Sequence, residues 1–308
     1  MPAKPPVHIR SITEYHQEMG LPKPEHPLIS IISFDLHSKQ HYKGSSNWVF
    51  DFYTIALKRN FKGKIKYGQQ EYDFDEGIMT FMSPGQVLRI ELNEGEQHNH
   101  SGYLLLLHPD FLWNTPLANQ INQYEFFEYW VHEALFLSDK EEQTIINTLK
   151  QIQHEYHGHI DKFTQHIIVA QLEVLLNYAE RFFQRQFITR KISGSKVLSR
   201  LEELISKYIE SDRLVLKGLP SVKLLSDQLN VSPNYLSALM KALTGKSTQQ
   251  HVQDKLIEKA KLQLTTTDLS VSEIAYSLGF GHPQSFSKLF KLKTNSSPLE
   301  FRASFNRN

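Results

Sequence analysis

Two short stretches of the sequence carry polar side chains whose types and spacing suit hydrogen bonding to the edges of DNA bases. They contain, in order, Asn234, Tyr235, Ser237 and Ala238, then His282, Pro283, Gln284, Ser287 and Lys288. A glutamine can bond adenine at two atoms, a lysine can reach the acceptors of guanine, and small apolar surfaces can contact a thymine methyl group. Lys241, Lys246 and Lys291 follow at positions that suit phosphate contacts. Each of these side chains could instead be an ordinary solvated surface group.

Both stretches sit in the same pattern of a helix, a turn and a second helix. VKLLSDQLNVSPNYLSALMK (222–241) aligns with VSEIAYSLGFGHPQSFSKLFK (271–291), with one extra residue after the turn in the second copy. Ser221 and Ser270 are typical helix caps, while Asn230 and Gly279 are residue types that tolerate a left-handed turn. The pattern is that of a helix-turn-helix. It occurs twice, with Leu225 and Ile274 at matching positions 49 residues apart.

The last third of the chain is predicted to be helical throughout. The expected helices are 197–211, 221–229, 232–243, 248–265, 270–278, 283–293 and a final turn at 298–304. The helix at 248–265 would be about 27 Å long at about 1.5 Å per residue. Successive major grooves on one face of DNA lie about 34 Å apart, so this helix could set the spacing of two reading helices. Phe280, Phe286 and Phe290 are assigned to the core rather than to base stacking.

Residues 197–308 resemble the DNA-binding domain of the AraC/XylS family of bacterial transcription regulators. The residues that carry the resemblance are Ile274-Ala275, Leu278-Gly279-Phe280, Ser285-Phe286-Ser287-Lys288, Phe290-Lys291, Ser297-Pro298 and Phe301-Arg302. Asn295 stands where the family usually has glycine, and Pro283 is unusual near the start of the second reading helix, although proline suits a first helical turn. The resemblance implies a transcription regulator, either an activator or a repressor, that binds double-stranded DNA as a homodimer, with RNA polymerase as a further partner.

The front of the chain reads mostly as short strands. Residues 27–112 hold six or more short runs rich in β-branched and aromatic residues, which suggests a small barrel or sandwich. This half resembles the family's cupin-like regulatory domain more loosely, best from Gly102-Tyr103-Leu104 to Leu112. We therefore expect an α+β multidomain protein. A cupin-like β-barrel with following helices would occupy residues 1–188, a linker 189–196, and an all-α domain with two helix-turn-helix motifs 197–308.

Two helices are predicted between the strands and the linker. The first begins at Ser138 with Glu141 three residues on, as in a capping box, and the second covers about 161–187. The second carries a broad apolar stripe that we assign to dimerisation: Ile168, Leu172, Leu175, Leu176 and Ala179. The alternative is that the same stripe packs inside the domain and caps the barrel.

The barrel raises two further hypotheses, a small-molecule pocket and a metal site. Six aromatic residues could line a pocket for an effector or simply fill the interior: Trp48, Phe50, Phe52, Tyr67, Phe81 and Tyr103. His98 and His100 with Glu91 or Glu94 could hold a metal in a cupin-type enzyme, but their segment reads as a solvated loop. The sequence shows no Ser/His/Asp arrangement, phosphate loop or dinucleotide fingerprint. We therefore expect no enzyme, no catalytic residue, no metal and no cofactor.

Composition separates the two halves by charge. Residues 190–308 hold 18 Lys and Arg against 10 Asp and Glu, whereas the remainder holds 16 against 23, within a formal net charge of +1. A basic segment joined to an acidic one is a hint of nucleic-acid contact. The chain has no cysteine, no apolar run long enough to span a bilayer and no apolar leader, so we expect a cytoplasmic protein away from membranes. A protein-interaction adaptor is the alternative, and weak salt dependence of binding would distinguish it.

Overall fold

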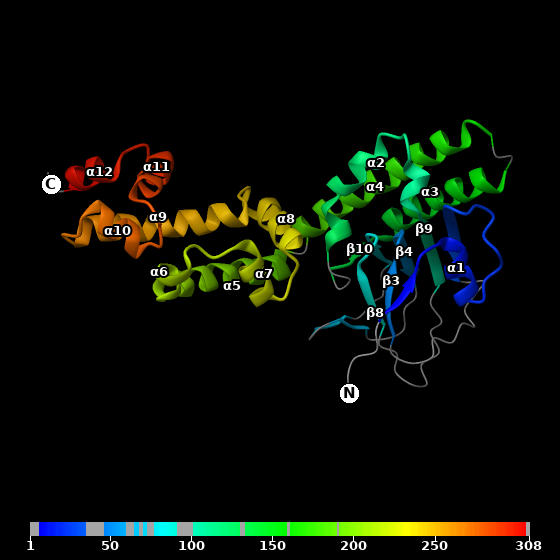
Figure 1. The fold of residues 1–308 in the computed structure, drawn as a ribbon, viewed down its shortest axis with the longest axis horizontal. Coiled ribbons are helices and arrows are strands. Elements are labelled where there is room, and N and C mark those ends of the chain that lie inside the picture. Colours follow the sequence, from blue (N-terminus) through cyan, green and yellow to red (C-terminus); the bar gives the residue numbers. More distant parts are fainter. Residues whose placement is uncertain are drawn as a thin grey trace. The chain divides into compact units, whose positions relative to one another are not determined.

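The computed structural model describes residues 6–34, 46–59, 65–67, 70–72, 77–90, 101–129, 133–158, 161–189 and 191–305. The chain divides into two compact units, Met1–Gln186 and Phe187–Asn308. The first contains the strands and the second is helical (Figure 1). None of the helices among these described residues combines the length and the hydropathy that a membrane span requires.

The first unit is built on a five-stranded antiparallel sheet. Its order is β10 (Leu135–Leu137), β7 (Gly77–Met82), β4 (Tyr53–Arg59), β9 (Ser101–Leu107) and β2 (Ile29–Ser33). A second sheet contains β1 (Val7–Ile9), β3 (Ser46–Phe50) and β8 (Val87–Ile90), and a hairpin pairs β5 (Ile65–Tyr67) with β6 (Gln70–Tyr72). Over the described residues, hydrogen bonds form three separate sheets rather than one closed barrel. The α+β class is confirmed at the level of a β-sheet region followed by helices.

The strand register decides which side chains share a face of the large sheet. Ala56 on β4 pairs with Leu104 on β9, and both belong to an apolar cluster between the two larger sheets. That cluster also contains Ile9, Ile12, Tyr15, Ile32, Phe50, Phe52 and Leu106. Since successive strand residues point to opposite faces, Ile55 and Leu57 lie on the other side of β4. Ile12 and Tyr15 come from α1 (Ile12–Glu18), which the sequence did not predict although Ser11 caps it.

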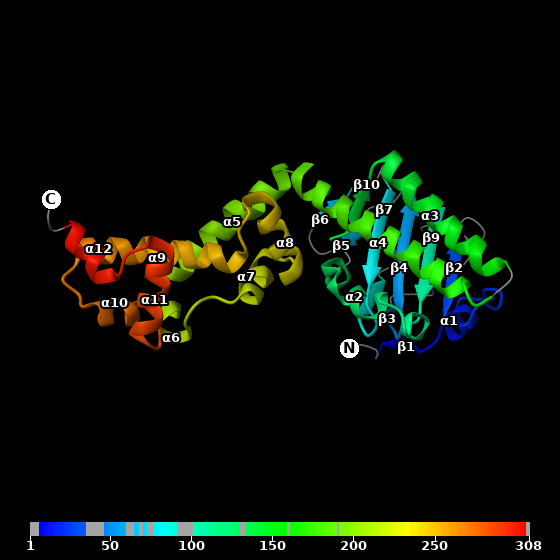
Figure 2. The ribbon, with the colours of Figure 1, turned by 90° about the horizontal axis from the view of Figure 1, so that it is seen from above.

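Two long helices cover the other face of the large sheet (Figure 2). They are α3 (Asp139–His157) and α4 (Thr164–Thr189). The predicted capping box of α3 is confirmed, because the Ser138 backbone N–H donates to the Glu141 carboxylate at 2.9 Å. On α3, the Tyr156 hydroxyl accepts from the Ile31 backbone N–H at 2.9 Å, and burial raises the pKa of Tyr156 to about 12.

The apolar stripe of α4 differs from its predicted role. Its members are between 0 and 1% exposed within a single chain: Ile168, Leu172, Leu175, Leu176 and Ala179. They are therefore core side chains, because a stripe that covers its own sheet has no surface left for a second subunit. Periodicity alone identifies the buried side of a helix but not what buries it.

Short helical turns lie between β9 and β10 in the chain. They are η2 (Pro109–Leu112), α2 (Leu117–Gln120), η3 (Ile121–Gln123) and η4 (Glu125–Glu128). Phe126 and Phe127 in η4 are buried, and Phe126 stacks on Phe183 of α4 with ring centroids 5.5 Å apart. This aromatic contact connects the end of the sheet to α4.

The second unit has eight helices in its described residues. They are α5 (Lys191–Glu210), α6 (Arg213–Lys217), α7 (Val222–Leu229), α8 (Pro233–Thr244), α9 (Thr248–Thr266), α10 (Val271–Ser277), α11 (Pro283–Thr294) and α12 (Pro298–Phe305). The sequence predicted these except α6. It also predicted a linker at 189–196, where α5 already begins at Lys191. An isolated glycine costs a helix only about 1 kcal/mol, so Gly194 does not end it.

Candidate nucleic-acid interface

The first helix-turn-helix consists of α7 and α8. Ser221 caps α7 by accepting from the Leu224 N–H at 3.2 Å. Asn230 then adopts the left-handed conformation, with φ 58° and ψ 46°, and turns the chain. Ser232 caps α8 by accepting from the Tyr235 N–H at 3.2 Å, and Pro233 fills the first helical position. Local chemistry therefore specifies both ends of the turn.

The second helix-turn-helix, α10 and α11, repeats this geometry. Ser270 caps α10 in a capping box with Glu273, which holds the pKa of that carboxyl below its usual range through hydrogen bonds from Ser270. Gly279 takes the left-handed position, with φ 78°. The next N–H closes the turn at the same place in both copies. Val231 donates to the Ser226 carbonyl at 3.1 Å, and Phe280 donates to the Ala275 carbonyl at 3.0 Å.

The second turn is more crowded than the first because α6 packs against it. A Cβ atom added to Gly279 would lie 2.3 Å from the Leu214 carbonyl oxygen and 3.3 Å from Gly218 Cα. Asparagine therefore suits the first turn, whereas the second has both a left-handed backbone and no room for a side chain. The sequence identified Gly279 by its backbone preference but missed this packing, since α6 was not predicted.

The repeat extends one helix beyond each helix-turn-helix. Gly245 and Asn295 are left-handed C-caps of α8 and α11, and each donates to the carbonyl four residues earlier at 2.9 Å. The prediction that Asn295 tolerates the usual glycine conformation is confirmed. Ser247 then caps α9, while Ser297 accepts from the Glu300 N–H at the start of α12. Both third helices were predicted, and the matching Thr-Gly-Lys-Ser (244–247) and Thr-Asn-Ser-Ser (294–297) mark them in the sequence as part of the repeat.

The inward faces of the two second helices form the core, as predicted. Leu236, Leu239 and Met240 are buried in the first copy, and Phe286 and Phe290 are fully buried in the second. Phe280 contacts Phe286 with ring centroids 5.5 Å apart. Phe286 and Phe290 are therefore core residues as predicted, whereas Phe280, also assigned to the core, is only half-buried.

All eleven predicted DNA contacts lie at least partly exposed. On α8 these are Asn234, Tyr235, Ser237, Ala238 and Lys241, and at the start of α11 and along it they are His282, Pro283, Gln284, Ser287, Lys288 and Lys291. Some of them also have contacts within the chain, among them Tyr235 and Ser237. The Tyr235 ring lies edge-on to Phe187 with centroids 5.3 Å apart, and the Ser237 hydroxyl donates to the Pro233 carbonyl at 2.9 Å. Ser237 still has lone pairs with which to accept a hydrogen bond.

Lys246, which the sequence suggested as a phosphate contact, has an intramolecular partner. Its ammonium group lies 2.8 Å from the Asp254 carboxylate on α9, and this bond raises the pKa of Lys246. Lys293, in the last turn of α11, bonds the other oxygen of Asp254 at 2.7 Å. Sequence spacing did not indicate this pairing, because Lys293 and Asp254 are 39 positions apart.

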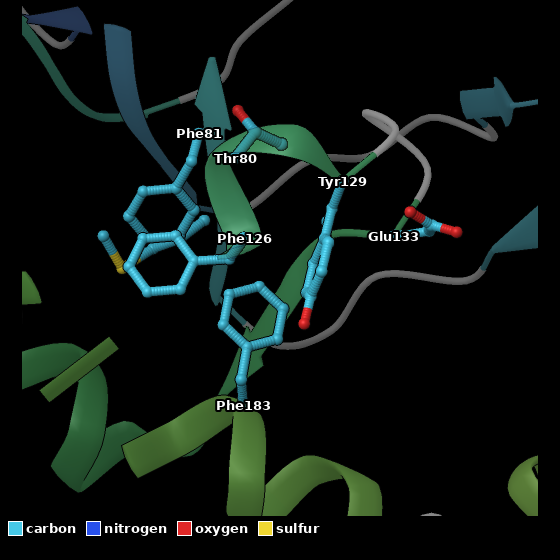
Figure 3. A pocket seen from close by; sticks show the side chains of 8 residues that line it. Thr80, Phe81, Phe126, Tyr129, Glu133 and Phe183 are labelled. Carbon is cyan, nitrogen blue, oxygen red and sulfur yellow. The ribbon is translucent and has the colours of Figure 1, made fainter. Parts of the chain in front are cut away.

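The six predicted pocket residues of the first unit do not line one pocket. Trp48 packs against the cluster between the sheets to which Phe50 and Phe52 belong. Phe81 pairs with Ile55, and Tyr103 pairs with Leu57, so both lie on the opposite, helix-facing side of the sheet. Figure 3 shows Phe81 beside Phe126 and Phe183, in a small pocket that Tyr129 and Glu133 also line. The side chain of Tyr67 lies outside the described residues.

The metal hypothesis falls on a part of the chain that the structure does not describe. His98, His100, Glu91 and Glu94 all lie in the segment 91–100, outside the described residues. Elsewhere, the described residues contain no group of three or more His, Asp and Glu that could hold a metal ion.

The packing around Gly279 predicts a specific loss of stability. Gly279→Ala is expected to lower the free energy of unfolding by about 1–3 kcal/mol, because alanine is strained in the left-handed region and its Cβ would collide with Leu214. Gly279→Asn should also lower the free energy of unfolding, because its Cβ meets the same Leu214 carbonyl oxygen although asparagine tolerates the left-handed backbone. Gly281→Ala is the matched control, because nothing lies within 4 Å of its added Cβ. Urea denaturation followed by circular dichroism measures the free energy of unfolding of all three variants. A Gly279→Ala protein as stable as the Gly281→Ala control would contradict the collision.

Known proteins resemble mainly the second unit. A family model described as a helix-turn-helix domain matches residues 225–304. The chain is 38% identical over 113 residues to the uncharacterized transcriptional regulatory protein YesN of Bacillus subtilis (strain 168), which covers 36% of this chain and 29% of that protein. It is also 38% identical over 73 residues to the arabinose operon regulatory protein of Salmonella typhimurium, covering 24% and 26%.

Among solved structures, the C-terminal domain of the two-component response regulator yesN from Fusobacterium nucleatum is 35% identical. That comparison covers 32% of this chain and 95% of that one, with a TM-score of 0.29. The chain thus spans less than a third of the length of the two curated relatives. The sequence match over residues 225–304, where the two capped copies lie, identifies an AraC/XylS-type helix-turn-helix domain in the second unit.

Proposed function

We propose that this chain is a sequence-specific DNA-binding transcription regulator rather than an enzyme. The observation that carries the proposal is the pair of helix-turn-helix copies, each with a second helix whose inward side is apolar and whose other side is polar. A regulator of this kind acts on bacterial DNA in the cytoplasm, and RNA polymerase is the partner that activation would require.

The connecting helix α9 supports simultaneous binding by both copies. It has 19 residues, which corresponds to about 28 Å at about 1.5 Å per residue. Adding the joints at Gly245 and Thr267 brings this close to the spacing of about 34 Å between successive major grooves. In this arrangement α8 and α11 would enter neighbouring grooves on one side of the duplex.

The residue types divide the proposed interface into reading and anchoring positions. Asn234 and Gln284 suit two-point bonding to adenine, and Lys288 suits the acceptors of guanine. Lys241 and Lys291, near the ends of the two helices, suit phosphates. None of the reading positions is arginine, so we expect DNA shape and paired sites to supply part of the selectivity.

We further propose that the first unit carries the dimer contact, through a face of α4 other than the predicted one. Phe163, just before α4, and Ile167 and Val174 on it are 56, 41 and 47% exposed. They lie on the side away from the buried stripe. A dimer would raise the effective concentration of the second DNA-binding unit at a paired site.

A small-molecule effector is the second proposal for the first unit, which we take to be cupin-like. The indole N–H of Trp48 is buried and has no hydrogen-bond partner in the described structure. Lys58 lies two residues after Ala56 and so on the same face of β4, and burial lowers the pKa of its ammonium group. Two donors directed to an apolar interior would suit a ligand with an anionic end and an apolar body.

DNA binding is tested by mapping bound sites across a genome and then measuring affinity for a recovered site at several salt concentrations. Gln284→Ala should cost about 1–3 kcal/mol at that site and leave the salt dependence unchanged. Lys291→Ala should weaken specific and non-specific DNA alike and reduce the salt slope by about 0.9. Lys207→Ala, on α5, is the control. Binding that does not depend on salt would favour a protein-interaction adaptor instead.

The dimer contact is tested by charge substitution on each side of α4. Val174→Glu should give a folded monomer in sedimentation velocity, because an exposed apolar side chain becomes an acid on a contact surface. Leu172→Glu should instead unfold the first unit, since it buries an unpaired charge. A Val174→Glu protein that remains dimeric would rule out this face.

The effector site is tested with the fluorescent anion 8-anilinonaphthalene-1-sulfonate. Lys58→Met should weaken its binding about tenfold, the usual effect of losing a hydrogen bond from a charged group. Lys23→Met, at an exposed position, should leave the affinity unchanged. Equal affinities of the parent and the Lys58→Met protein would contradict an anion site at Lys58.

A further inference from the structure

One carboxylate in the second unit bonds lysines that belong to different copies of the repeat. Asp254 lies on α9 and receives Lys246 at 2.8 Å on one oxygen and Lys293 at 2.7 Å on the other. Lys246 directly follows Gly245, the C-cap of α8, and Lys293 lies in the last turn of α11. The C-terminal ends of both candidate reading helices are thus bonded to the helix that joins them.

The environment of this cluster favours two charged partners for one acid. Asp254 is 29% exposed and Lys293 is 21% exposed, whereas Lys246 is 55% exposed. Burial alone raises the pKa of Asp254, but the hydrogen bonds from Lys246 and Lys293 outweigh it and hold that pKa below its usual range. The Lys293 bond is the better protected from solvent, so we expect it to be the stronger of the two.

The bond between Lys293 and Asp254 is one of two attachments that join the second copy to α9. The second copy also meets the far end of α9, where the Arg302 guanidinium donates to the Leu264 carbonyl at 3.0 Å. Leu264 and Asp254 are ten residues apart, or about 15 Å along the helix axis. Two attachments at that separation resist rotation of α11 against α9, whereas one attachment would act as a pivot.

The first copy is held to α9 near the same place. The Thr244 hydroxyl lies 2.8 Å from the His251 ring, one turn before Asp254. Burial lowers the pKa of His251, and the nearby Lys246 charge adds to that effect. The short connection between α8 and α9 already constrains the first copy, and Lys246 adds a second bond at the same place.

We propose that Asp254 is a positioning residue that fixes the angle between α8 and α11 by holding Lys293, and secondarily Lys246, on α9. It makes no contact with DNA in this scheme. The claim concerns the geometry of the unbound chain and does not depend on the proposed function.

The distance between the two reading helices is the direct test. Because the chain has no cysteine, Lys241→Cys and Lys291→Cys introduce two unique sites for nitroxide labels on the full-length protein. Double electron–electron resonance should give a narrow distance distribution for this parent and a clearly broader or shifted one after Asp254→Asn. Glu258→Gln is the matched control on the same helix, because Glu258 pairs with Lys255 three residues away.

A second pair of variants separates positioning from loss of folding. Lys293→Met should broaden the distribution nearly as much as Asp254→Asn, whereas Lys246→Met should change it less. Circular dichroism should show the same helix content for all of them. A distribution for Asp254→Asn or Lys293→Met that matches the parent would overturn the proposal.

DNA binding supplies a readout that a general loss of stability would not reproduce. At a recovered site, Asp254→Asn should bind about three- to tenfold more weakly. It should also discriminate less against a site with one extra base pair between its two contacted segments, because a loosened pair of helices accommodates altered spacing. Unchanged spacing discrimination would contradict the positioning role. If the chain without substitutions binds no DNA while the labelled chain gives a narrow distance distribution, the proposed function alone is refuted.

Discussion

A single left-handed residue between two helices determines where each candidate reading helix points. Asn230 and Gly279 both have positive φ, 58° and 78°, yet their surroundings differ. The first turn has room for a polar side chain, whereas the second lies against the end of α6 and admits only hydrogen at Cα. If either residue left this region, the amide that closes the turn would lose its carbonyl partner. The polar face of the following helix would then change direction.

The two copies form one reading surface only if α9, the helix between them, fixes the orientation of one copy relative to the other. α9 provides buried contacts along its length through Val252, Leu256, Ile257, Ala260 and Leu264. Apolar packing of this kind is strong but weakly directional. A polar bond with defined geometry, such as that between Lys293 and Asp254, supplies the direction that apolar packing leaves open. The same division between packing and orientation applies at Arg302, whose guanidinium donates to two backbone carbonyls.

Local signals allowed most of the second unit to be predicted from sequence. Caps, left-handed turn residues and first-turn prolines act within four or five positions, so Ser221, Asn230 and Pro283 could be assigned without knowing the fold. The errors concern information that is not local. The stripe on α4 was identified correctly as apolar, but whether its own sheet or a second subunit covers it depends on tertiary packing. Phe81 and Tyr103 were grouped with Phe52 because the sequence does not give the strand pairing. That pairing decides on which face of the sheet each side chain lies. The pairing of Lys293 with Asp254 and the packing of α6 likewise join residues that are distant in sequence.

The distribution of charge limits which of the two units can contact DNA and which kind of contact a dimer can use. The segment before residue 190 carries an excess of acidic side chains, and the remainder carries an excess of basic ones. Phosphate neutralisation, the main source of affinity for DNA, must then come from the second unit. An acidic unit near the duplex would be repelled, which favours contact through the basic unit alone. Two such acidic units brought together in a dimer would also repel each other. An apolar contact is therefore the chemistry that a dimer of this chain would need, and the exposed residues Ile167 and Val174 on α4 offer it.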